Sequence, residues 1–484
     1  LKERLEENGE YEFATQVPFA NSTSFGEGQA FSDRHIQLFS MVFYLLNVAE
    51  INHAVQERRQ QENSDLSATE GLWAWQFNYL KEKGFSEKDI AEALPGIRIE
   101  PVLTAHPTEA KRATVLEHHR ELYVNMVQRE NTMFSRKEQE DIRQQIKLTL
   151  YKLWQTGEIF IEKPDVASEL RNVMHYFTNV FPEIVPLVDK RLIQAWEDAG
   201  FDKALLFENE AFPRIRFGDW VGGDRDGHPF VTATITRQTL QQLRLNAFVV
   251  LRRTLVGLVR SLSFKLQFAE APEMLRKRMN EMVAELGQEG QTALERNKGE
   301  AFRQFLGLVL AKLPLETARG HATALKEQPS SYTHASELTA DLETLQHALL
   351  AFGARSVAWH DVRSAIRQVR CFGFHLAALD IRQNSAFHDN AITQLMELAG
   401  LAGREWTEKD EEWRVAFVNG ELQSLRPFSH PRHTLPNEAK AVVEAHTVVE
   451  EYISKYGIHG IGAFIVSMTR NVSDLLAVYL LGRE

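Results

Sequence analysis

The chain has 484 residues, a mass of 55.4 kDa and a formal net charge of −11. Apolar residues make up 44% and charged residues 25%, which is the mix of a globular protein and excludes a disordered or collagen-like chain. At roughly 150 residues per domain, this length allows about three domains or one large one.

The acidic balance and the single cysteine exclude further classes. We expect no nucleic-acid partner, because neutralising phosphates requires a basic face. Cys371 stands alone, so these residues cannot form an intramolecular disulfide, and a reducing, cytoplasmic location is predicted. No stretch approaches the roughly 18 uncharged apolar residues of a membrane span. The longest candidate, 458–469, is broken by His459, and we expect no membrane partner.

Most of the chain is predicted to be helical. Apolar residues recur at helical spacing from residue 36, and similar patterns cover 107–130, 137–160, 165–200, 235–283, 300–312, 336–352 and 438–456. Polar stretches at 326–336 and 426–437 are expected to be surface loops. No clear linker divides the chain, so we expect one intertwined unit over residues 1–484.

Four strand-length apolar segments interrupt the helical pattern, at 97–104, 214–221, 375–381 and 462–468. Each is followed by polar residues and then by a helical pattern. This order predicts a mainly α protein built on a parallel sheet or β/α barrel, with its chemistry at the C-terminal ends of the strands. Four strands are too few to close an ordinary barrel, so we expect part of the fold to lie outside these residues.

The first predicted strand leads into His106-Pro107-Thr108-Glu109. Pro107 suits the first position of a helix, which places His106 between the strand end and a helix N-terminus. The positive end of the helix disfavours an imidazolium ion, so a neutral His106 could accept a proton near pH 7. A purely structural histidine is the alternative.

The second predicted strand runs into a glycine-rich turn that contains Gly222, Gly223, Asp224, Arg225 and Asp226. Its glycines would allow positive φ or a close approach of the backbone to a ligand. Arg225 lies between two aspartates, and a guanidinium held in such a fork could bind a carboxylate or a phosphate. The alternative is an Asp/Gly turn with internal ion pairs.

Asp380 and Arg382 end the third predicted strand. Because they are two residues apart, they should share one face of that strand, while Ile381 points to the other. They form either a buried ion pair or a site in which Arg382 reaches an anionic ligand. Trp220, just before the glycine-rich turn, could supply an apolar wall.

Three motifs in this order resemble the phosphoenolpyruvate carboxylase family. VLTAHPTE (102–109) is similar to the family's histidine signature. FGDWVGGDRDGHPFVT (217–232) is similar to its FGSWMGGDRDGNPxVT segment, and FGFHLAALDIRQNS (372–385) to its FGLxLxxLDIRQxS segment. Weaker similarity extends from about residue 35 to the end of the chain.

The resemblance implies an eight-stranded β/α barrel, of which about four strands lie in this chain. It implies carboxylation of phosphoenolpyruvate by bicarbonate to oxaloacetate and phosphate, with Mg²⁺ or Mn²⁺, in a homotetramer. His106 matches the catalytic histidine. Arg382 matches an arginine that contacts the substrates, Trp220 matches a pocket tryptophan, and Arg225 with its neighbours matches the glycine-rich segment.

Two departures and one absence accompany the resemblance. His228 replaces the usual Asn of the glycine-rich segment, and Lys111-Arg112-Ala113 stands where the family often has paired arginines. The family's metal-binding acids lie downstream of these motifs, so none of this chain's residues is assigned to the metal. We expect activity only together with the C-terminal half. The alternatives are a non-catalytic helical scaffold that keeps the motifs as turns and, less favoured, another anion-binding barrel such as a phosphosugar aldolase.

Overall fold

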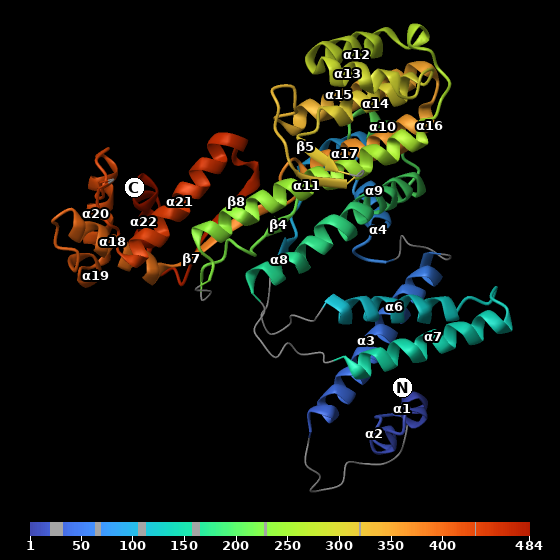
Figure 1. Cartoon of the computed structure of the whole chain (residues 1–484), viewed down its shortest axis with the longest axis horizontal. Coiled ribbons are helices and arrows are strands. Elements are labelled where there is room, and N and C mark those ends of the chain that lie inside the picture. Colours follow the sequence, from blue (N-terminus) through green and yellow to red (C-terminus); the bar gives the residue numbers. More distant parts are fainter. Residues whose placement is uncertain are drawn as a thin grey trace. The chain divides into compact units, whose positions relative to one another are not determined.

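The computed structural model describes residues 1–19, 32–62, 69–104, 113–156, 165–226, 230–318, 321–430 and 432–484. The chain divides into two compact units (Figure 1). Unit 1 comprises Leu1–Tyr79 and His106–Asp165, and unit 2 comprises Leu80–Ala105 and Val166–Glu484. The expectation of one intertwined unit over residues 1–484 stays a prediction.

Unit 1 is helical in its described part. Its core contains Leu38, Leu122, Leu150 and Trp154, all buried on facing helices. Ser135 begins the last helix with a capping box. The helices are α1 (Lys2–Glu7), α2 (Tyr11–Thr15), α3 (Asp33–Glu62), α6 (Ala113–Arg129) and α7 (Arg136–Gln155). The sequence of α4 (Trp73–Glu82) is divided between the units after Tyr79.

Among the described helices, α3 is long and apolar enough to cross a membrane, judged by length and composition alone. The sequence interpretation overlooked this segment, and the one it named, 458–469, forms a strand instead. The core helix of a globular protein passes the same test, and α3 buries Leu38, Met41 and Val42 in the core of unit 1. The length of α3 is therefore weak evidence for a membrane span.

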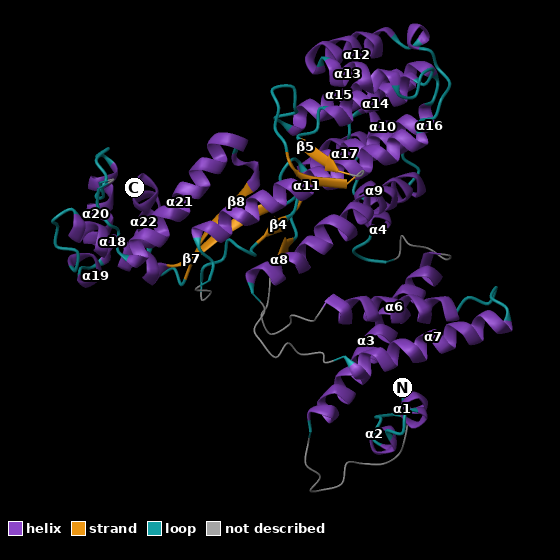
Figure 2. Cartoon of the chain, viewed as in Figure 1, coloured by secondary structure: helices purple, strands orange, loops and turns teal. Residues whose placement is uncertain are grey.

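Unit 2 contains a four-stranded parallel sheet (Figure 2). Its strands lie side by side in sequence order, and each of the four predicted apolar segments contributes one of them. The sheet strands are β2 (Val102–Leu103), β4 (Gly218–Asp219), β7 (Ala378–Asn384) and β8 (Ile461–Ser467). A second parallel pair, β1 (Arg98–Ile99) with β3 (Arg214–Ile215), precedes β2 and β4. The parallel strands are confirmed, and closure into a barrel stays a prediction.

Helices cover one face of this sheet. Leu240, Leu243 and Ala247 of α11 share a buried apolar cluster with Leu379 and Ile381 of β7. Two further clusters lie among helices, one around α12–α17 and one around α18–α22. The helices are α5 (Glu87–Ala93), α8 (Val166–His175), α9 (Phe181–Asp198), α10 (Lys203–Glu208), α11 (Ala233–Ser261), α12 (Glu273–Leu286), α13 (Gln288–Glu295), α14 (Ala301–Ala311), α15 (Ala335–Phe352), α16 (Arg355–Val357), α17 (Arg363–Phe372), α18 (Ser385–Leu398), α19 (Glu405–Glu408), α20 (Glu411–Leu422), α21 (Asn437–Tyr456) and α22 (Val472–Arg483).

Two features of unit 2 differ from the sequence prediction. The continuous helix expected over 235–283 ends at Ser261 and restarts at Glu273. Pro272 lacks the N–H that a helix interior needs and stands at the N-cap, which accounts for the start of α12. The antiparallel hairpin of β5 (Leu315–Ala318) and β6 (His321–Leu325) was not predicted.

Candidate active site

The side chains of β7 alternate between the helical core and the opposite face of the sheet. Leu379 and Ile381 are 0% and 1% exposed and pack in the cluster under α11. Asp380 and Arg382 therefore point to the other face, as their spacing predicts. Polar groups of β4 and of the turn after it meet these two side chains there.

Arg382 is held by three of the predicted site residues. Its Nε donates to Oδ1 of Asp224 at 2.8 Å, and its Nη2 lies 3.6 Å from Oδ2 of Asp226. The guanidinium carbon lies 4.6 Å from the ring centroid of Trp220. The Arg382 side chain is still 24% exposed, so the guanidinium is fixed and yet open to a ligand.

The glycine-rich turn lies directly on β7. Gly222 has a φ of +85°, and an added Cβ there would overlap the hydroxyl of Thr239. Gly223 has no room for a Cβ against the carbonyl oxygen of Asp380. The backbone N–H of Arg382 donates to Gly223 at 3.0 Å, and that of Arg225 donates to Arg382 at 2.8 Å. The positive φ at Gly222 is confirmed, while the close approach of Gly223 is to the backbone of β7, and an approach to a ligand stays a prediction.

The prediction that Asp224 and Asp226 hold Arg225 in a fork was wrong. Asp224 and Asp226 bind Arg382, whereas Arg225 donates from Nη2 to Oγ1 of Thr236 at 3.0 Å. Thr236 in turn donates to the carbonyl of Gly222 at 2.8 Å. Burial lowers the pKa of Arg225 to about 10. Arg225 therefore ties the turn to α11.

Sequence reasoning missed Asp219, which is fully buried at the end of β4. Its Oδ1 accepts from the N–H of Val221 at 3.0 Å, and its Oδ2 has no hydrogen-bond partner among the described residues. Burial, reinforced by the charge of Asp380, raises the pKa of Asp219 to about 8. An acid inside the apolar run FGDWV was the signal that could have identified it.

Two residues of the sequence-based interpretation, His106 and His228, lie outside the described residues. The same holds for Lys111 and Arg112. The place of His106 at the end of the first strand, and its role as a proton acceptor, therefore stay predictions.

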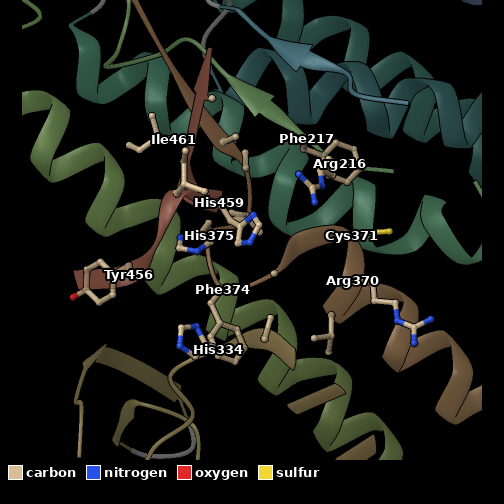
Figure 3. A pocket seen from close by; sticks show the side chains of 18 of the residues that line it. Arg216, Phe217, His334, Arg370, Cys371, Phe374, His375, Tyr456, His459 and Ile461 are labelled. Carbon is tan, nitrogen blue, oxygen red and sulfur yellow. The ribbon is translucent and has the colours of Figure 1, made fainter. Parts of the chain in front are cut away.

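A cavity of about 1150 Å³ lies at the opposite ends of the strands, where Ala378 begins β7 and Ile461 begins β8 (Figure 3). His375 and His459 lie near each other in this cavity, and the Nδ1 of His375 is 2.7 Å from the Tyr452 hydroxyl. Burial, aided by the charge of Arg244, lowers the pKa of His375 to about 3. Asp380 also lines this cavity.

The described residues do not offer a fitting metal site. No group of three or more His, Cys, Asp or Glu side chains among them is arranged to hold a metal ion. Asp224 and Asp226 of the candidate site are already engaged by Arg382. No chemical step is therefore assigned to a metal held by this part of the chain.

The fold and the site define a mainly helical β/α protein that presents a clamped arginine and a glycine-rich turn at the C-terminal ends of parallel strands. The family model described as phosphoenolpyruvate carboxylase matches residues 30–484. The chain belongs to the phosphoenolpyruvate carboxylase family, which confirms the resemblance seen in the sequence.

Curated relatives named phosphoenolpyruvate carboxylase agree with this assignment. The relative from Methylorubrum extorquens is 32% identical over 463 residues, covering 93% of this chain and 49% of the relative. The relative from Rhodopseudomonas palustris is 30% identical over 457 residues, covering 93% and 47%. The relative from Gloeobacter violaceus is 29% identical over 461 residues, covering 93% and 48%. The chain thus spans about half the length of the curated relatives it matches.

Proposed function

We propose that this chain forms part of an enzyme that carboxylates phosphoenolpyruvate with bicarbonate, giving oxaloacetate and phosphate. Family membership and the names of the relatives support this lyase activity. Because the chain matches about half of each relative, we propose that it acts together with polypeptide that corresponds to the other half.

The clamped Arg382 carries the proposal. Asp224, Asp226 and Trp220 fix the guanidinium at the strand ends, where β/α proteins place their ligands. Its planar N–H groups match the geometry of a carboxylate or a phosphate, and phosphoenolpyruvate carries both. Arg382 would bind this anion, and the Trp220 face would border an apolar space suited to carbon dioxide.

The proposed reaction transfers the phosphoryl group first. A bicarbonate oxygen attacks the phosphorus, the bond between phosphorus and the enol oxygen breaks, and carboxyphosphate and the pyruvate enolate form. His106 takes the carboxyl proton of carboxyphosphate, whose C–O bond to phosphate then breaks to release CO₂. The enolate carbon attacks this CO₂, which yields oxaloacetate, and the proton leaves with the phosphate.

The remaining parts of the proposal concern the metal, the assembly and the location. Mg²⁺ or Mn²⁺ would neutralise phosphoryl charge from ligands outside the described residues, since these offer no fitting set. The complete enzyme is proposed to be a cytoplasmic homotetramer.

A non-catalytic scaffold is the second candidate, and one observation favours it. Two carboxylates already neutralise Arg382, which a purely structural ion-pair turn would also show. The two candidates differ in whether the site binds phosphoenolpyruvate.

A polypeptide that joins this chain to the remaining half of the Methylorubrum extorquens relative, called the joined polypeptide below, serves for both tests. Calorimetric titration of phosphoenolpyruvate into it in the presence of Mg²⁺ tests the site, with Arg382→Ala as the control. Saturable binding that this substitution removes supports the enzyme, and binding that is absent or unaffected by the substitution favours the scaffold. Activity of the joined polypeptide is measured by coupling oxaloacetate to NADH oxidation through malate dehydrogenase. Bicarbonate-dependent turnover is expected, and His106→Asn should abolish it. Unchanged turnover in His106→Asn would show that His106 is not the proton acceptor.

A further inference from the structure

We propose that Asp380 is a positioning residue for Arg382 and that it acts through the indole ring of Trp220. The inference rests on the proposed function, in which Arg382 binds the anionic substrate. The Asp380 side chain hydrogen-bonds to Trp220 and Ala463, not to Arg382, so its effect on Arg382 would be indirect.

Asp380 links the strands on either side of β7. Its Oδ2 accepts the indole Nε1–H of Trp220, which follows β4, at 2.9 Å. Its Oδ1 accepts the backbone N–H of Ala463 in β8 at 2.7 Å. Asp380 is 8% exposed, so both bonds form largely away from water. The orientation of the Trp220 ring is therefore tied to the backbones of two strands.

The backbone around Asp380 leaves it little freedom. Gly462, next to Ala463, has no room for a Cβ against Oδ1 of Asp380. Gly223 has none against the Asp380 carbonyl oxygen on the other side. Two glycines thus let neighbouring backbones close on this one residue, which fixes the carboxylate more firmly than hydrogen bonds alone would.

The electrostatic consequence reaches Arg382. A carboxylate that accepts the indole N–H pushes electron density into the ring, which makes the ring face more attractive to a cation. The guanidinium of Arg382 lies over this ring, 4.6 Å from its centroid. Asp380, Trp220 and Arg382 therefore form a stack of carboxylate, indole and guanidinium.

This stack differs in its effect from the ion pairs to Asp224 and Asp226. Those aspartates would compete with an incoming anion for the same N–H groups, whereas the ring face holds the cation without occupying them. Arg382 can then exchange a carboxylate for substrate while its plane stays fixed, which spares the entropy of ordering a long side chain at the moment of binding. The hydrogen bond from Trp220 to Asp380 should therefore raise the affinity of Arg382 for an anion.

Fluorescence tests the first link, from Asp380 to Trp220. The chain has 8 tryptophans, so the Trp220 signal is obtained as the spectrum of the unsubstituted chain minus that of Trp220→Phe. In the Asp380→Asn background the same subtraction is expected to give a shifted maximum, because the indole N–H loses its charged acceptor. Asp341→Asn is the matched control, since Asp341 is a buried carboxylate bound to Tyr332 and Arg278 in another cluster. An unshifted Trp220 signal in Asp380→Asn would overturn the inference.

Titration of phosphoenolpyruvate into the joined polypeptide tests the second link, from Trp220 to Arg382. Asp380→Asn is expected to weaken binding about tenfold, and Asp341→Asn to leave it unchanged. In the Trp220→Phe background, adding Asp380→Asn should cost no further affinity, because the ring that transmits the effect is absent. Full affinity in Asp380→Asn, or an equal loss in both backgrounds, would overturn the inference.

The proposed function can fail separately. If the joined polypeptide without substitutions binds no phosphoenolpyruvate, the proposed function is wrong. Urea unfolding of the chain in a double-substitution cycle between Asp380→Asn and Arg382→Gln then decides the positioning role. The two shifts in midpoint should be non-additive, and additive in the Trp220→Phe background. Additivity in both backgrounds would overturn the inference.

Discussion

Gly223 lies so close to Asp380 that a Cβ on Gly223 would overlap the Asp380 carbonyl oxygen. The same contact brings the Gly223 carbonyl within 3.0 Å of the Arg382 N–H, and the Arg382 carbonyl within 2.8 Å of the Arg225 N–H. The turn after β4 is thereby paired with the end of β7. Asp224 and Asp226 can reach the Arg382 side chain only because of this pairing.

Gly223→Ala should therefore damage the site and the fold together. The added methyl group meets backbone, which cannot rotate away, so the turn must leave β7 and release both aspartates from Arg382. We expect loss of phosphoenolpyruvate binding in calorimetry and a lower unfolding midpoint in urea. Gly420→Ala is the control, because Gly420 lies in α20 with open space around its Cβ position and should gain roughly 0.5–1 kcal/mol in stability. Normal binding by Gly223→Ala would contradict the close pairing.

Arg382→Lys should fail to replace the arginine. Lysine keeps one positive charge but cannot donate to Asp224, approach Asp226 and lie flat on Trp220 at once. We expect the affinity for phosphoenolpyruvate to fall at least tenfold, with isothermal titration as the measurement. Arg370→Lys supplies the control, since Arg370 is an exposed arginine paired with Glu343 and Glu210. Equal affinities for both variants would show that charge alone matters at position 382.

Acid should destabilise unit 2 through His388. This side chain is 1% exposed, and both its ring nitrogens lack hydrogen-bond partners among the described residues. Burial, together with nearby His446 and against the pull of Asp474, lowers the pKa of His388 to about 4. Between pH 6.5 and pH 4 this histidine is protonated in the unfolded chain but stays neutral in the folded one. The free energy of unfolding therefore falls as the pH falls, by about 3 kcal/mol across this window.

Thermal unfolding from pH 7.5 to pH 4 checks this expectation. His388→Leu should flatten the decline in melting temperature below pH 6.5, although His375, with its pKa of about 3, keeps part of it. His433→Leu changes an exposed histidine and should leave the profile as it is. A parallel profile for His388→Leu would rule out the assigned titration.

The strands were predictable because their apolar runs are visible in the sequence, but their bounds were not. The 97–104 segment forms two strands, β1 and β2, because Pro101 has no N–H for a continuous ladder. The β5–β6 hairpin has the sequences LETA and HATAL, in which Glu316 and His321 interrupt the apolar residues. Because apolar and polar residues do not alternate regularly there, the local sequence does not predict these strands.

At the site, spacing predicted which residues share a face but not which partners they choose. Asp380 and Arg382 followed from the two-residue period of a strand. Asp224 and Asp226 pair with Arg382 rather than with Arg225 because of the register between β4 and β7. Asp224 and Arg382 are 158 residues apart in the chain, so the local sequence does not show that they pair. The raised pKa of Asp219 likewise follows from tertiary burial.

Removing one partner from the buried ion pair between α9 and α17 should cost more stability than removing one from an exposed pair. Asp189 is 2% exposed and accepts from Arg367 at 3.0 Å and from Arg363 at 3.3 Å. Asp189→Ala leaves two guanidiniums buried without their carboxylate, which should cost about 3–5 kcal/mol of the free energy of unfolding. Glu197→Ala removes the exposed partner of Lys203, a pair of 2.6 Å, and should cost less than about 1 kcal/mol. Urea unfolding measures both, and similar midpoints for the two variants would show that water reaches Arg363 and Arg367 once Asp189 is gone.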